Sequence, residues 1–188
     1  MQNMKVKDFM RPVGDFPRIS EEISFGEAVM ALRKSDMEFQ SGRGKQRILL
    51  VENAEGAIVG KLSPMDVLSG LEPQFSVSAA EQRHLSYSSS FEHVMKNMFE
   101  QAMLWTQPLE ELCTKAAGVK VKNFIRRPTE QQTVSAEDSL NVAVHRFVLG
   151  RHDALFVTRD KTLTGILRFS DVYRELGRVI STACGLPP

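Results

Sequence analysis

The residue pattern with the clearest chemical use lies at positions 60–66, where Gly60, Ser63 and Asp66 are spaced three residues apart. The apolar run before it predicts a β-strand, and Ser63 followed by proline predicts a helix start. At such a junction the Ser63 hydroxyl and the free backbone amides can bind a phosphate, and Asp66 can accept hydrogen bonds from ribose hydroxyls. The structural alternative is that Ser63 only caps the helix and Asp66 complements its dipole.

This pattern and the sequence around it occur twice. Residues 5–10 (KVKDFM) return as residues 120–125 (KVKNFI), and residues 60–66 (GKLSPMD) return in looser form as residues 165–171 (GILRFSD). Matching apolar positions between two otherwise diverged stretches indicate that the chain contains two copies of one unit.

Each copy predicts the same order of elements: strand, helix, strand, strand, helix. In the first copy, Ser24 and Glu27 form a capping-box pattern that opens the first helix, and the run 48–51 predicts a strand buried on both faces. The other predicted elements lie at 18–20, 57–62 and from 63 in the first copy, and at 133–134, 140–149, 154–157, 163–167 and 171–179 in the second.

The predicted fold class is α+β. Two β-α-β-β-α units, at 1–71 and 119–188, are expected to pack around a pseudo-twofold axis, because neither is large enough to bury much apolar surface alone. An α-helical insert at 72–118 separates them. Its polar start, 73–90, predicts a loop, and two helices are expected after it, an amphipathic one over 91–105 and another over 107–118. The apolar face of the first, with Met95, Met98, Phe99 and Trp105, predicts packing on a repeat, a second subunit or a partner rather than a ligand cavity.

Composition excludes several classes of protein. Of the 188 residues, 42% are hydrophobic, and 24 basic residues nearly balance 23 acidic ones. A formal net charge of +1 gives no global field to attract DNA or anionic lipid. The sequence also lacks an apolar run long enough for a membrane helix or a signal peptide, so we expect a cytoplasmic location.

The repeat and the pattern at 60–66 together resemble the tandem cystathionine-beta-synthase (CBS) domain family, whose units have this element order and a Gly-x-x-Ser/Thr-x-x-Asp signature. The resemblance covers residues 5–71 and 120–177. It implies a disc-like module with two clefts, which often bind adenine nucleotides or S-adenosylmethionine and regulate an attached or partner protein.

The resemblance also implies roles for individual residues. Ser63 would contact phosphate, Asp66 and Asp171 would bind ribose, and the backbone around Ile19 and Leu49 would frame the base. The expected ligand-binding residues are Ile19, Leu49, Lys61, Ser63 and Asp66 in the first copy, and Thr133, Val134, Leu155, Arg168 and Asp171 in the second.

The second copy departs from the signature, because Arg168 stands at the Ser/Thr position. Arg168 could bind a phosphate as a bidentate donor, fill the cleft and block it, or form a surface ion pair. We therefore expect two inequivalent clefts, of which at most one binds tightly.

A basic loop precedes the second strand of the first copy. Residues 40–47 place Arg43 and Lys45 among two glycines, where they could close over a polyphosphate. The loop lacks the strand and the Ser/Thr of a P-loop, and a solvated mobile loop is the alternative.

No pattern predicts catalysis. The four histidines lack metal-ligand spacing, the two cysteines lack paired spacing, and no nucleophile motif is present. We expect a non-catalytic protein that requires no metal or cofactor, binds AMP, ADP or ATP as a regulatory ligand, forms a homodimer and acts in trans on an unidentified protein target. The alternative is a dimerisation or protein-interaction scaffold with vestigial nucleotide clefts.

Overall fold

The structure is a computed structural model and describes residues 4–71 and 108–185. The predicted loop 73–90 and the predicted helix 91–105, with Met95, Met98, Phe99 and Trp105, lie outside these residues. The second predicted helix of the insert is present as α5 (Leu109–Ala116).

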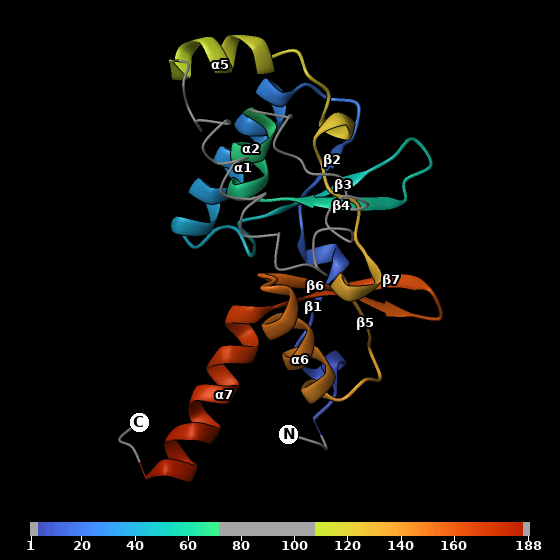
Figure 1. Cartoon of the computed structure of the whole chain (residues 1–188), viewed down its shortest axis with the longest axis vertical. Coiled ribbons are helices and arrows are strands. Elements are labelled where there is room, and N and C mark those ends of the chain that lie inside the picture. Colours follow the sequence, from blue (N-terminus) through green and yellow to red (C-terminus); the bar gives the residue numbers. More distant parts are fainter. Residues whose placement is uncertain (1–3, 72–107, 186–188) are drawn as a thin grey trace, which may run out of the picture.

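The first unit has the predicted element order (Figure 1). It contains β2 (Arg18–Ser20), α1 (Phe25–Gln40), β3 (Leu49–Glu52), β4 (Ile58–Leu62) and α2 (Pro64–Leu71). Strand β3 lies between β2, to which it is parallel, and β4, to which it is antiparallel. The predicted capping box forms at the start of α1: the Glu27 amide donates to Ser24 Oγ, and the Ser24 amide donates to Glu27 Oε2 at 2.8 Å.

The second unit repeats this order with longer elements. It contains β5 (Thr133–Ser135), α6 (Leu140–Gly150), β6 (Ala154–Arg159), β7 (Thr162–Arg168) and α7 (Phe169–Cys184). Helix α7 extends beyond the predicted 171–179. It starts where Phe169 packs edge-on against Phe147, and it ends at Gly185, whose φ of 63° forms a left-handed cap.

The start of each unit packs against the other unit, so the two units exchange their leading segments. The short strand β1 (Arg11–Pro12) pairs with β7 of the second unit, and Val6 is fully buried in the second unit's core. In the opposite direction, Val121 and Phe124 are buried in the core of the first unit. Short 3-10 turns occur in and beside these segments, at Val6–Asp8, Val13–Asp15, Val121–Asn123 and Glu130–Gln132.

Matching lysine–glutamate contacts fasten both exchanged segments. Lys120 and Lys122 donate to the Glu22 carboxylate at 2.6 and 2.8 Å, and their hydrogen bonds lower the pKa of Glu22 to about 2. At the equivalent positions, Lys7 donates to the carboxylate of Glu137 at 3.0 Å, and Lys5 donates to the backbone carbonyl of Glu137. The repeated KVK motif therefore binds each segment to the opposite unit.

The two sheets face each other between the helices of the two units (Figure 1). A separate apolar cluster joins them, formed by Phe16, Leu50, Ala154, Phe156 and Ile166. The other face of each sheet packs against its own helices, so Leu49 and Val51 point to one core while Leu50 points to the other. This confirms the prediction that β3 is buried on both faces, and the molecule is of the α+β class.

Candidate functional site

The Gly-x-x-Ser-x-x-Asp pattern of the first unit lies at the junction of β4 and α2, as predicted. Asp66 Oδ2 accepts hydrogen bonds from the Ser63 amide at 2.8 Å and from Ser63 Oγ at 2.5 Å. The Asp66 carboxylate therefore caps the start of α2. The buried Ser63 hydroxyl uses its hydrogen-bond donor for Asp66. Among the residues that the structure describes, none donates a hydrogen bond to the second oxygen, Oδ1.

Lys61 connects this site to the second unit. Its Nζ atom lies 3.8 Å from Asp66 Oδ2 and 3.1 Å from Asp153 Oδ1. The neighbouring His152 has a buried Nε2 atom that finds no hydrogen-bond partner within residues 4–71 and 108–185. Burial lowers the pKa of His152, and the positive charge of Lys61 lowers it further, against an opposing effect of Asp153.

The signature glycines let the exchanged segments approach closely. A Cβ atom added to Gly60 would lie 3.1 Å from the carbonyl oxygen of Arg126, and one added to Gly165 would lie 2.7 Å from that of Arg11. Arg11 and Arg126 occupy the same position of the repeat, directly after the six-residue motif. The exchange thus places one arginine beside each signature.

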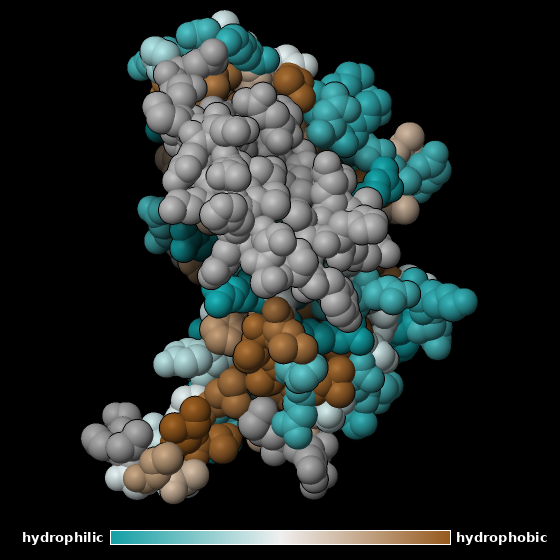
Figure 2. Space-filling view, viewed as in Figure 1, coloured by the Kyte–Doolittle hydropathy of each residue, from teal (hydrophilic) through white to brown (hydrophobic). Residues whose placement is uncertain are grey.

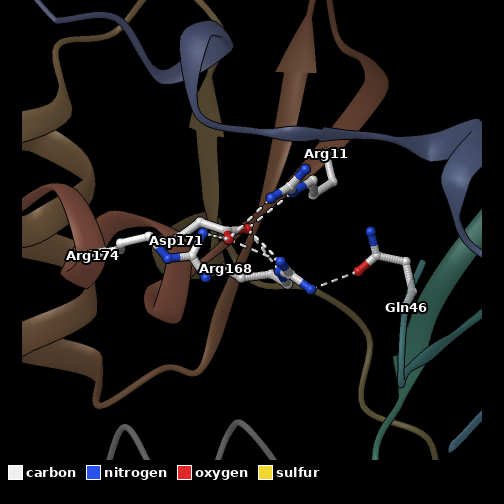
Figure 3. A network of polar contacts seen from close by, with 5 residues as sticks. All are labelled: Arg11, Gln46, Arg168, Asp171 and Arg174. Carbon is white, nitrogen blue, oxygen red and sulfur yellow. Dashed lines mark hydrogen bonds and ion pairs between the residues drawn. The ribbon is translucent and has the colours of Figure 1, made fainter. Parts of the chain in front are cut away.

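In the second unit, arginines surround the equivalent carboxylate (Figure 3). Arg168 is bidentate to Asp171, with Nε 2.8 Å from Oδ2 and NH2 2.9 Å from Oδ1. Arg11, from β1, binds the same two oxygens at 3.1 and 3.2 Å. Arg174 lies 3.5 Å from Oδ1, one turn further along α7.

Asp171 is held ionised in this environment. Its side chain is only 6% exposed, and burial alone would raise its pKa, but hydrogen bonds from Arg168 and Arg11 outweigh burial and lower the pKa to about 2. Arg168 NH1 also donates to Gln46 Oε1 at 2.9 Å and so links the site to the first unit. Of the three interpretations of Arg168, the structure shows an ion pair, but a largely buried one inside the site rather than one on the surface.

The two sites therefore differ in their free polar groups. Both oxygens of Asp171 are engaged by arginines, whereas Asp66 keeps Oδ1 without a donor in the described part of the chain. Arg126 is exposed and makes no ion pair or side-chain hydrogen bond with any described residue, unlike its counterpart Arg11.

The basic loop 40–47 reaches the second site rather than the first. Lys45 forms an ion pair with Asp15 at 2.7 Å, and Arg43 donates to Ser41 within the loop. Gln46 is buried and binds Arg168. Both predicted phosphate ligands of this loop thus have partners within the chain, and no contact with Asp66 is found among the described residues.

Comparison with known proteins agrees with this architecture. The family model described as CBS domain matches residues 121–178. This segment, which makes up most of the second unit, therefore matches the CBS domain family. No curated relative matches the chain in sequence.

Several solved structures share the fold over nearly the whole chain. CBSX2 in complex with AMP has a TM-score of 0.57 at 20% identity, with 94% of this chain and 99% of that chain covered. An uncharacterized conserved protein from Pyrococcus horikoshii has a TM-score of 0.55 at 14% identity, with 94% of each chain covered. The CBS domains of a transcriptional regulator from Streptococcus pneumoniae reach 0.51 at 12% identity, with 92% of this chain and 98% of that chain covered.

The remaining expected ligand residues lie on paired strands. Leu49, Val134 and Leu155 point their side chains into the cores, so only their backbone is left to contact a ligand. Ile19 is partly buried, and the Thr133 hydroxyl donates to the Thr129 carbonyl.

Sequence reasoning missed five residues at the two sites: Arg11 and Arg126, which follow the two KVK motifs, and also Gln46, Asp153 and Arg174. The repeat alignment contained a signal for Arg11 and Arg126, because both follow the KVK motif at the same offset. It contained none for Gln46 and Asp153, whose contacts cross between the units.

The described residues show no other candidate chemistry. Across 4–71 and 108–185, no group of three or more His, Cys, Asp or Glu side chains is arranged to hold a metal ion. Cys113 and Cys184 are both free and exposed. Within the same ranges, no helix combines the length and apolar character needed to cross a membrane.

Proposed function

We propose that this protein binds an adenine nucleotide at the Asp66 site and thereby regulates a partner protein in trans in the cytoplasm, without catalysis of its own. The observation that carries the proposal is the Oδ1 atom of Asp66, which has no donor among the described residues and lies at a helix start next to Lys61. The backbone of Arg126 lies beside Gly60 of the same pattern, and its side chain has no partner within the described ranges. The complex of the similar CBSX2 with AMP supports the choice of ligand.

The chemistry of the site suits a nucleoside monophosphate. Oδ1 can accept a hydrogen bond from a ribose hydroxyl, since an ionised carboxylate accepts at both oxygens. The Lys61 charge is shared with Asp66 and Asp153, so Arg126 is the cation available for a phosphate. Arg126 was not among the predicted residues, and it takes the phosphate role that the sequence assigned to Ser63.

Isothermal titration calorimetry with AMP tests this assignment. Asp66→Ala should weaken binding roughly tenfold or more, since a hydrogen bond to a charged group contributes about 1.5–3 kcal/mol. Glu55→Ala is the matched control, because it removes an exposed carboxylate from the turn between β3 and β4. Equal affinity of wild type and Asp66→Ala would refute the site.

The ligand can be identified from the shift in thermal unfolding temperature that AMP, ADP, ATP, NADH and S-adenosylmethionine each produce. A ligand at 100 times its dissociation constant stabilises the folded state by about 2.7 kcal/mol. We expect the largest shift from an adenine nucleotide, and no shift from any of the five would contradict the sensor function.

A scaffold is the second candidate function, and the surface of the second unit favours it. Apolar side chains gather on this face (Figure 2), and the exposed ones on α6 and α7 include Val148, Leu149, Tyr173 and Ile180. We propose that this face forms the homodimer. Ile180→Glu should then lower the mass found by light scattering at low concentration, and an unchanged mass would count against this interface.

A further inference from the structure

We infer that Arg168 closes the Asp171 site by occupying, with its own guanidinium, the carboxylate positions that a ribose would need. The inference rests on the proposed function, in which the signature aspartate accepts ribose hydroxyls. Its subject is the second unit, where serine or threonine of the signature is replaced by arginine.

A count of hydrogen-bond acceptors carries the argument. A carboxylate has about four lone-pair positions, two on each oxygen. Arg11 donates to both oxygens of Asp171, Arg168 donates to both again, and Arg174 adds a longer bond of 3.5 Å to Oδ1, so the four positions are filled. A ribose could bind only by displacing a bidentate ion pair, in which donor and acceptor are both charged, with uncharged hydroxyl donors, and the Arg168 guanidinium would then lose its carboxylate partner.

Arg168 is also held in this position from the other unit. Its third hydrogen bond goes to Gln46 Oε1, and the side chain is only 22% exposed. Gln46 is itself 3% exposed and is fixed by the Ser35 hydroxyl, which donates to its backbone carbonyl at 2.9 Å. The closing arginine is therefore part of the packed contact between the units, not a surface side chain that can move aside freely.

Removal of Arg168 alone should open the site without an unpaired buried charge. Arg11 would still neutralise Asp171 through one lone pair on each oxygen. The two positions that Arg168 leaves, again one on each oxygen, match the two donors of a ribose cis-diol. The only remaining competitor among the described residues is the long 3.5 Å bond from the exposed Arg174 to Oδ1. Arg168→Ser restores the signature residue that Ser63 represents in the first unit.

The test is the number of AMP molecules bound per chain, measured by calorimetry. We expect one for wild type and two for Arg168→Ser, with one remaining in the double variant Asp66→Ala/Arg168→Ser. Arg178→Ser is the matched control: it breaks another arginine–carboxylate pair three residues apart on α7, and should leave one AMP per chain. Arg168→Thr serves as the second variant if thermal unfolding shows that Arg168→Ser is unfolded.

The outcomes separate this inference from the proposed function. One AMP in both wild type and Arg168→Ser overturns the closure but leaves the Asp66 site intact. No AMP in wild type and one in Arg168→Ser supports the closure and refutes binding at Asp66. Two AMP molecules in wild type, loss of binding in Arg168→Ser, or no binding by either protein overturns the closure.

Discussion

At the scale of single residues, the main feature is a carboxylate with more arginines than its charge requires. Asp171 carries one negative charge and contacts Arg11, Arg168 and Arg174. A buried ion pair of this kind contributes little to the free energy of unfolding, because the cost of desolvating its charges offsets their attraction. Loss of the carboxylate is costly, however, since it leaves the arginines facing one another.

The low pKa of Asp171 predicts how stability depends on pH. The group has a pKa of about 2 in the folded protein, below its ordinary value of 3.8, so its contribution is present above about pH 4 and is lost as the pH falls toward 2. Asp171→Asn should lower the free energy of unfolding by about 2 kcal/mol at neutral pH, because the substitution removes hydrogen bonds between the carboxylate and charged arginine donors. Urea unfolding of both proteins should show this difference shrinking between pH 4 and 2, and a constant difference would contradict the prediction.

At the scale of elements, the exchanged segments contribute buried apolar side chains together with exposed charges. Val121 is fully buried, and the ring of Phe124 lies edge-on to Phe25 with centroids 5.6 Å apart. The lysines that flank Val121 are exposed and bind Glu22. Burial of the apolar side chains should therefore dominate the binding of the segment, because exposed ion pairs contribute at most about 1 kcal/mol.

Two substitutions in the same segment separate these contributions. Phe124→Ala should lower the free energy of unfolding by about 3–5 kcal/mol, the usual cost of deleting a buried aromatic ring. Lys122→Ala should have a much smaller effect, because an exposed ion pair contributes little to stability. Chemical denaturation measures both, and a larger effect of the lysine would overturn this ranking.

Much of the order of elements could be predicted from the sequence, and their pairing could not. The capping box at Ser24, the apolar run of β3 and the serine–proline start of α2 are local signals, and each lies where the pattern placed it. An alignment of the repeats shows which segments are similar in sequence. It does not show that each KVK segment packs against the unit that it does not precede. The position of Asp171 was likewise predictable, but its partner Arg11 is 160 residues away in sequence.

At the scale of the whole molecule, the two units are not independent domains. They share the core between the sheets, exchange their leading segments and are joined by the Lys61–Asp153 and Gln46–Arg168 contacts. Loss of structure in one unit removes buried surface from the other. The described part of the chain should therefore unfold as one cooperative structure.

Calorimetric unfolding tests this cooperativity. A single transition is expected, with the calorimetric enthalpy equal to the van't Hoff enthalpy. Leu50→Ala, in the core between the sheets, should lower the stability of the whole transition by about 2–5 kcal/mol. Two separate transitions in either protein would show that the units unfold independently.

The exchange of leading segments has a consequence for synthesis on the ribosome. Strand β1 is synthesised long before its partner strand β7, because the whole of the first unit and the insert lie between them. The first unit, in turn, lacks Val121 and Phe124 until the segment after the insert has been made. Neither unit can complete its core early, so folding has to wait for contacts between distant parts of the sequence, which makes it slow and leaves apolar surface exposed in the nascent chain.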